Sequence, residues 1–573
     1  MNKPAARLTA LSLSLLLFAG CATTAVTPVA NPGQQAALAL LEQGKPREAA
    51  QQLEAEAGKA RGALRTQLLA DAAFAWHEAG DNARARSLAA QVQPRQLTGA
   101  SRSRFALLTA ELALTDKQPA NALQALADGF QQAPPALHAR WLLTQADALE
   151  GTGDGFAAAS SRARASTLLE AKARTDNQQA IGRLLAGVDD RTLSARATAL
   201  PAGDPLYNHA GRALMARGLA LPRPFDADPQ RQLDTSKRPA AERDGYRPPV
   251  KLAVLLPLSG NLATAAAPVR DGLLAGYYAE HRRRPDIQFI DTRGSAAGAT
   301  AAYDKAVAAG VDFVVGPLGR DEVDALFARD LSVPVLALNR GKDAPPAGSA
   351  GFSLAPEDDG LMAAEYLRAR ERGSAVIIAS SDDNGRRAAN AFKERFIQRG
   401  GQVSSTLSVS DNPADISAQL RAATGADAVF LAVKGAQARV LAPQLALSGL
   451  GGALRVGGSQ LATGTGKEDE DTALDGIVFP SETWTARGVA GLPSSTSLAT
   501  TLPTARGGAA RLFAFGFDAW QITAYMERLI TAPDSGVGGA TGTLYLDGFG
   551  NILRKPAWST FSGGRPTPIA DGR

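Results

Sequence analysis

The sequence predicts a multidomain α and α/β protein, in which an all-α first half precedes a two-lobed α/β second half. Three features of the 573 residues lead to this prediction. A short apolar run near the N-terminus ends at the only cysteine, Cys21. Residues 31–218 carry apolar side chains at helical spacing, and from Val250 onward unbroken apolar runs alternate with helical patterns. Such alternation is typical of α/β folds with parallel sheets.

The N-terminal run has the composition of a secretory signal. Lys3 and Arg7 supply positive charge ahead of an apolar stretch from Leu8 to Phe18. This stretch is too short to cross a bilayer, which needs about 20 apolar residues. We therefore expect a signal peptide at residues 1–20 rather than a membrane helix.

The end of this run resembles the lipobox of bacterial lipoproteins, because two small residues come directly before Cys21. The resemblance implies lipidation of Cys21, which would become the N-terminus and lead into a tether, residues 21–30. Phe18 departs from the leucine usual in the motif, and Ala22 in place of an aspartate favours the outer membrane over the inner one. The alternative is an ordinary signal peptide with an incidental cysteine.

Charge and cysteine content restrict the possible partners and cofactors. Removing residues 1–20 takes away two positive charges and lowers the formal charge from +5 to +3. This near balance argues against nucleic acid, which would require a clustered basic face. With Cys21 lipidated no thiol remains, so the fold cannot depend on disulfides or cysteine-bound zinc. We expect no cofactor and no metal.

Residues 31–218 contain a repeat in which a turn precedes an alanine. The four alanines are 36, 37 and 36 residues apart: Ala49, Ala85, Ala122 and Ala158. Each follows a turn residue by five positions: Gly44, Gly80, Lys117 and Gly153. This period resembles the tetratricopeptide repeat (TPR), in which the alanine lets two helices approach closely. A TPR-like domain would offer a surface for proteins or polymers such as peptidoglycan, or would serve only as a spacer.

The segment 219–249 is dense in proline and charge and has no hydrophobic period, which indicates a linker. It would be an extended tether, or it would lie against both neighbouring domains. From 250 to 573 the sequence predicts two successive α/β units, that is, two lobes with parallel strands buried on both faces.

The second half resembles a known fold and family. LAVLLPLSGNLATAAAPVRDGLLAGYY, DFVVGPLGRDEV, PVLALN, FSLAPEDDG and AVIIASSDDNGRRAANAFKERF are similar to the type I periplasmic-binding-protein fold. In detail they resemble the C-terminal domain of the penicillin-binding protein activator lipoproteins. The similarity runs from about Lys251 to Phe561 and includes RLFAFGFDAWQ and GATGTLYLDGFGNILRKPAW. In that family a lipobox, a TPR-like half and this domain occur in the same order.

The resemblance implies a regulator of peptidoglycan synthesis. We expect a lipoprotein of the outer membrane, facing the periplasm, that binds and activates a bifunctional penicillin-binding protein, with peptidoglycan as a possible further contact. The alternative is a lipid-anchored receptor of a transport system that clamps an amino-acid-like solute. One departure from the family is the stretch 485–509, which is polar and rich in Gly and Pro and is expected to be a mobile surface loop.

No catalytic motif emerges from the sequence. The four histidines are far apart and lack metal-ligand spacing, and GTGKE at 464–468 lacks the residues of a phosphate-binding loop. DDNG at 382–385 is better explained as a helix cap than as a calcium loop, and DGFGN at 547–551 as a hairpin turn. We therefore expect no enzymatic activity.

Ligands of open α/β sheets bind at the carboxyl ends of the strands, where loops and helix N-termini converge. This rule selects eight candidate cleft-lining residues: Ser259, Gly260, Gly316, Pro317, Leu318, Asn339, Ser381 and Asp382. The alternative is that these residues only form strand-end turns and that the cleft binds no ligand.

Overall fold

The structure is a computed structural model that describes residues 31–226, 235–236, 238–342, 344–346, 348–423, 425–531 and 536–570. Cys21 and the predicted signal peptide and tether lie outside the described residues. The chain forms two compact units, one extending to Leu137 and the other running from His138 to Arg573. Within the described ranges, no helix is long and apolar enough to cross a membrane.

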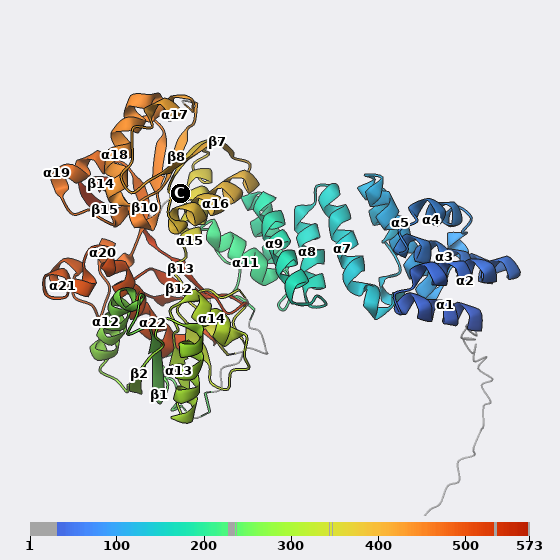
Figure 1. Ribbon diagram of the computed structural model, residues 1–573, viewed down its shortest axis with the longest axis horizontal. Helices are drawn as coiled ribbons and strands as arrows, with labels where there is room; N and C mark the ends of the chain where they lie inside the picture. The colour runs from blue at the N-terminus through green and yellow to red at the C-terminus, as the bar shows by residue number, and fades with distance from the viewer. Residues whose placement is uncertain are drawn as a thin grey trace, which may run out of the picture. The chain divides into compact units, whose positions relative to one another are not determined.

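The first half is helical, as predicted (Figure 1). Its helices are α1 (Pro32–Glu42), α2 (Pro46–Lys59), α3 (Gly62–Glu78), α4 (Asn82–Ala89), α5 (Gly99–Thr115), α6 (Pro119–Ala125), α7 (Pro135–Gly151), α8 (Gly155–Ser166), α9 (Ala171–Gly187), α10 (Asp190–Ala199) and α11 (Tyr207–Ala216).

The repeat read from the sequence corresponds to helical hairpins. All four repeat alanines are fully buried. The four turn residues have left-handed backbone angles, with φ between 57° at Lys117 and 88° at Gly153. A left-handed residue after a helix reverses the chain, and a buried alanine lets the two helices pack closely. The predicted turn and packing positions are therefore confirmed.

Lobe 1 is built on a five-stranded parallel sheet of order β2-β1-β3-β4-β5. Its strands are β1 (Lys251–Leu256), β2 (Asp286–Asp291), β3 (Phe313–Val315), β4 (Val335–Ala337) and β5 (Ala350–Gly351). Its helices are α12 (Ala263–Ala279), α13 (Ala296–Ala308), α14 (Arg320–Phe327) and α22 (Ala509–Thr531). A small antiparallel sheet, β11 (Val537–Gly538), β12 (Thr543–Leu546) and β13 (Ile552–Lys555), shares the lobe 1 core.

Lobe 2 is built on a seven-stranded sheet of order β15-β14-β10-β9-β8-β6-β7. Its strands are β6 (Ser374–Ser380), β7 (Gln402–Val409), β8 (Ala428–Ala432), β9 (Leu454–Gly457), β10 (Val478–Ser481), β14 (Ala557–Ser562) and β15 (Arg565–Ile569). Its helices are α15 (Pro356–Arg368), α16 (Asp383–Gln398), α17 (Ser417–Arg421), α18 (Gly435–Leu445) and α19 (Glu468–Asp471). β6 to β10 are parallel, and β14 and β15 are added antiparallel.

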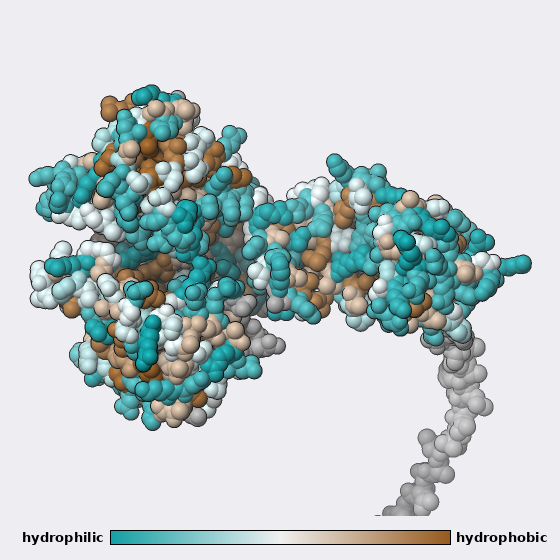
Figure 2. Space-filling view, in the orientation of Figure 1, coloured by the Kyte–Doolittle hydropathy of each residue, from teal (hydrophilic) through white to brown (hydrophobic). Residues whose placement is uncertain are grey.

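The central strands of each large sheet are buried on both faces, which is why they are continuous apolar runs, whereas the edge strands β7 and β15 are more exposed and more polar. Glycines allow α12 and α22 to approach closely: a Cβ on Gly272 would lie 1.9 Å from the Phe513 carbonyl oxygen, and one on Gly516 would lie 2.0 Å from that of Val269. The two-lobed α/β architecture predicted from the sequence is therefore confirmed. Figure 2 shows the surface hollowed between the two lobes.

The segments predicted to be irregular are partly ordered by packing. In 485–509, expected to be a mobile surface loop, α20 (Thr483–Arg487) ends and α21 (Ser495–Thr501) forms. Leu498 and Leu502 pack against the apolar cluster around Trp484. These contacts order part of a segment whose polar composition predicts a mobile loop. In the linker, Tyr246 belongs to the lobe 1 core, which favours a linker that lies against its neighbours.

Candidate functional site

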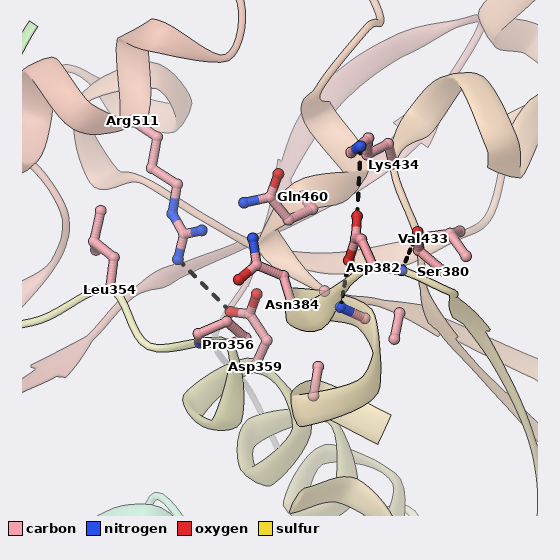
Figure 3. A pocket seen from close by; sticks show the side chains of 14 residues that line it. Leu354, Pro356, Asp359, Ser380, Asp382, Asn384, Val433, Lys434, Gln460 and Arg511 are labelled. Carbon is pink, nitrogen blue, oxygen red and sulfur yellow. Dashed lines mark hydrogen bonds and ion pairs between the residues drawn. The ribbon is translucent and has the colours of Figure 1, made fainter. Parts of the chain in front are cut away.

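A pocket lined by both charged and apolar side chains lies at the carboxyl ends of β6, β8 and β9 in lobe 2 (Figure 3). Its volume of about 90 Å³ is enough for several water molecules or a small polar molecule. The N-terminus of α16 and the segments that follow β8 and β9 form most of the lining, and Arg511 comes from α22 of lobe 1. The pocket is therefore formed mainly by lobe 2 and bounded by one lobe 1 cation.

Asp382 and Lys434 form the lobe 2 side of the pocket. Asp382 caps α16, because its carboxylate accepts a hydrogen bond from the Gly385 N–H at 2.8 Å. The Lys434 ammonium lies 3.5 Å from the same carboxylate. Burial acts to raise the pKa of Asp382, but the Gly385 N–H and the lysine outweigh it and hold the pKa below its usual value. The carboxylate is thus ionised near neutral pH.

Asp359 is the most enclosed charged group of the pocket, with 4% of its side chain exposed. Its Oδ2 accepts hydrogen bonds from the Ser459 N–H at 3.0 Å and the Ser459 hydroxyl at 2.6 Å. Its Oδ1 has no hydrogen-bond partner among the described residues. One half of the carboxylate therefore holds the β9 end in place, and the other half faces the pocket.

Arg511 reaches toward Asp359 from the opposite lobe, as Figure 3 shows. Its Nη2 lies 3.9 Å from Asp359 Oδ1, and its Nε lies 3.1 Å from Glu482 Oε1. Neither Nε nor Nη2 makes a well-aligned hydrogen bond within the described part of the chain. A water or a small polar ligand could therefore bridge this cation and Asp359.

The lining contains no histidine or cysteine among the residues that the structure describes. In the same residues, no group of three or more His, Cys, Asp or Glu side chains is placed to hold a metal ion. What the arrangement can do chemically is hold a small molecule that both donates and accepts hydrogen bonds.

Of the eight candidate cleft residues, Asp382 lines this pocket. Ser381, beside it, uses its backbone N–H to bond the Val409 carbonyl at 2.8 Å. DDNG acts as a helix cap, as predicted. Whether the cleft binds any ligand stays a prediction.

The six lobe 1 candidates take part in bonds and contacts inside their own lobe. The Ser259 hydroxyl donates to Asp291 Oδ2 at 2.6 Å. The Asn339 amide donates to the Leu318 carbonyl at 3.0 Å, and Pro317 accepts from the Leu338 N–H at 2.9 Å. Gly260 has a left-handed φ of 79°. Gly316 also has a positive φ, and a Cβ there would lie 2.0 Å from the Leu255 carbonyl oxygen.

Sequence reasoning missed Asp359, Arg511 and Gln460. Asp359 lies in the first turn of α15, where an acidic residue is ordinary. Gln460 comes from a segment without a motif, and Arg511 begins RLFAFGFDAWQ, a segment to which the resemblance assigned no ligand role. The fold of lobe 2 brings Asp359 and Gln460 together, and the packing of the two lobes adds Arg511.

The family of this chain follows from its α/β half. The family model described as "LppC putative lipoprotein" matches residues 246–564, which is more than half of the chain. The chain belongs to this LppC lipoprotein family. The matched range covers both lobes described above, including the pocket.

Curated relatives of this LppC-family chain carry one name. "Penicillin-binding protein activator LpoA" of Photobacterium profundum is 26% identical over 362 residues, covering 56% of this chain and 57% of the relative. The protein of the same name from Mannheimia succiniciproducens is 26% identical over 339 residues, covering 56% and 55%. The chain thus spans a little over half the length of the curated relatives it matches.

A solved structure extends the likeness to the helical half. A monoclinic form of Haemophilus influenzae LpoA has a TM-score of 0.55 and 20% identity, and the match covers 91% of this chain and 98% of that one. At this identity the likeness shows the fold alone. The helical half and the α/β half therefore occur together in a solved relative of this fold.

Proposed function

We propose that this protein is an outer-membrane lipoprotein, facing the periplasm, that binds and activates a bifunctional penicillin-binding protein and so regulates peptidoglycan synthesis. The observation that carries the proposal is the match of more than half of this chain to relatives named as penicillin-binding protein activators. The helical half, which a solved LpoA also has, supports it. Activation would require the protein to bind the active state of the synthase more tightly than the inactive one.

The proposed anchor is Cys21. After cleavage behind residue 20, acylated Cys21 would hold the chain in the outer membrane, and residues 21–30 would be the tether. The domain at 31–218 would then supply reach, the segment 219–249 would connect it, and the domain at 250–573 would act on the synthase. Peptidoglycan lies on this path and is proposed as a further contact. Cys21→Ser would release the protein from the membrane fraction, whereas substitution of a residue in the tether would not.

The test of the proposal uses the acylated protein as bait on detergent-solubilised membranes, followed by a binding measurement with each purified partner. We expect a bifunctional penicillin-binding protein to be captured and to bind directly. Recovery of an inner-membrane permease without a synthase would favour the transport receptor instead. Calorimetric titration of the full chain with amino acids further distinguishes an activator from a transport receptor, because a receptor would give saturable heat of binding.

A further inference from the structure

Helix α11 contacts both lobes of the α/β half from the outside. We infer that α11 is a fixed brace that holds the two lobes at one separation, so that this protein does not open and close its cleft. The inference concerns motion within residues 138–573 and does not depend on the identity of any partner.

One side of α11 is bound to lobe 1 through the β12–β13 hairpin. The Arg212 guanidinium lies 3.3 Å from Asp547 Oδ2, and that aspartate side chain is fully buried. The His209 ring packs 4.4 Å from the Phe549 ring. A Cβ on Gly548 would lie 1.7 Å from the side-chain amide nitrogen of Asn208, so the hairpin backbone lies directly against this side chain of the helix.

The hairpin itself is fixed to lobe 1. Asp547 Oδ1 accepts hydrogen bonds from the N–H groups of Phe549 at 2.9 Å and Asn551 at 2.7 Å, which hold the turn rigid. The Gly351 N–H donates to the Gly550 carbonyl at 2.9 Å, which ties the turn to β5. A force on the hairpin is therefore passed to the lobe 1 sheet.

The other end of the brace is bound to lobe 2 by a charge network in which a half-exposed aspartate joins two largely buried arginines. Arg217, directly after α11, donates to Asp190 Oδ1 at 3.0 Å, and its Nη2 donates to the Leu185 carbonyl at 2.6 Å. Arg399, directly after α16, donates to the same Asp190 oxygen at 2.9 Å and to Glu365 Oε2 of α15 at 3.2 Å. Asp190 thus joins the helical layer to lobe 2.

Separation of this network would be unfavourable on the arginine side. Only 1% of the Arg217 side chain, 6% of the Glu365 side chain and 14% of the Arg399 side chain is exposed, whereas 47% of the Asp190 side chain is exposed. Loss of the Asp190 carboxylate would leave the largely buried Arg217 and Arg399 guanidinium groups with one ionic partner fewer, which is unfavourable. The half-exposed Asp190 itself would be solvated by water.

The chain that follows α11 is fastened to lobe 1 a second time. Arg238, whose side chain is 1% exposed, lies 3.0 Å from Asp312 Oδ2. Arg247 lies 2.8 Å from Glu527 of α22, and its N–H donates to the Ala524 carbonyl at 2.8 Å. Movement of lobe 1 relative to lobe 2 would therefore break contacts at one end of α11 or the other.

The test measures the distance between the lobes in the full chain. Spin labels are placed at Tyr278→Cys in lobe 1 and Leu447→Cys in lobe 2, which are 65% and 79% exposed. The background is Cys21→Ala, which removes the one native cysteine. We expect pulsed electron paramagnetic resonance to give a single narrow distance distribution. The double substitution His209→Ala and Arg212→Ala removes side-chain contacts of α11 with lobe 1, and Asp190→Ala removes those of its other end with lobe 2. Either change cuts one end of the brace and should widen the distance distribution about twofold.

The matched control is Arg183→Ala, which removes a paired arginine of α9 whose partner is Glu150, within the helical layer. We expect it to leave the distance distribution unchanged. A broad or two-peaked distribution in the uncut protein would overturn the inference, and so would a narrow one that survives both cuts. Circular dichroism of each variant verifies folding, and if one cut unfolds the protein, the other cut and the uncut protein still decide.

Discussion

The two lobes are alike in topology and differ at the edge where a ligand would bind. In lobe 1 the Ser259 hydroxyl and the Asn339 amide both bond within the lobe, and Gly316 leaves no room for a side chain. Glu322 Oε1 of lobe 1 has no hydrogen-bond partner among the described residues, but it lies outside the pocket lining. In lobe 2 the corresponding edge opens into a pocket in which Asp359 keeps an unbonded oxygen. A shared fold therefore does not give the two edges the same chemistry.

This difference shows that the two lobes do not offer equivalent ligand-facing groups to the cleft. A receptor that closes on a solute needs ligand-facing groups on both lobes and freedom to move. Here lobe 1 contributes one charged side chain to the described pocket lining, that of Arg511, and the lobes are braced from outside by α11. The arrangement suits a rigid body that presents a surface, as an activator of an enzyme would.

The largest expected effect comes from a substitution at the closely packed edge of lobe 1. Gly316→Ala forces a Cβ to within 2.0 Å of the Leu255 carbonyl oxygen at a φ of 97°, so we expect a loss of at least about 3 kcal/mol in the free energy of unfolding. The comparison in lobe 2 is Gly458→Ala, at the end of β9, where φ is −80° and the nearest atom is 3.2 Å away. It should cost less than about 1 kcal/mol. Urea denaturation of both variants measures the pair, and equal losses would contradict the contrast.

The next effect concerns the buried carboxylate of the lobe 2 pocket. Asp359→Ala removes the acceptor of the Ser459 N–H and hydroxyl, and we expect the free energy of unfolding to fall by about 2 kcal/mol. Asp383→Ala, at an exposed aspartate of the same edge, should stay within about 0.5 kcal/mol of the parent. Thermal unfolding compares the two variants. A neutral Asp359→Ala would show that this residue does not support the β9 end.

A matched pair of asparagines sharpens the comparison further. Asn339→Ala in lobe 1 removes a hydrogen bond to the Leu318 carbonyl and should cost about 1 kcal/mol. Asn384→Ala in the lobe 2 pocket affects an exposed side chain and should change stability by less than about 0.5 kcal/mol. The denaturant midpoints of the two variants and the parent, measured side by side, show which substitution costs more stability. The reverse order would mean that the pocket edge, and not lobe 1, depends on its polar side chains.

The smallest effect is a pH dependence at the lobe 1 edge. The Ser259 hydroxyl and nearby N–H groups hold the pKa of Asp291 below its usual value. The unfolded chain therefore takes up a proton before the folded one does, and stability is lost as the pH falls below about 4. Asp291→Asn should lose about 0.5 kcal/mol less than the parent between pH 5 and pH 3, because solvent screens this half-exposed group. The same loss of unfolding free energy in Asp291→Asn and in the parent between pH 5 and pH 3 would contradict this prediction.

The sequence predicted the fold well where the determinants are local. A left-handed turn residue and a small residue five positions later are both readable from the chain, so Gly44 with Ala49 and Gly153 with Ala158 fall where expected. The parallel strands were readable because burial on both faces requires continuous apolar runs. The α21 helix could not be predicted from the sequence, because its order depends on where Leu498 and Leu502 pack in the folded protein.

The pocket and the brace were largely beyond sequence reasoning. The strand-end rule led to Asp382, but it also selected Ser259 and Asn339. The side chains of both residues already donate hydrogen bonds within lobe 1. Arg511 reaches the pocket only because lobe 1 faces lobe 2 there. Asp190 joins Arg217 to Arg399 across a wide gap in sequence, and no local pattern marks such a contact.

The central claim is that this protein activates a peptidoglycan synthase by binding it. The most direct measurement is the rate of glycan polymerisation and of peptide cross-linking by purified bifunctional penicillin-binding proteins from the same cell, titrated with the mature protein. The account predicts that one of them accelerates to a plateau once the protein saturates it. Rates that stay unchanged at saturating protein for every such synthase would contradict the account.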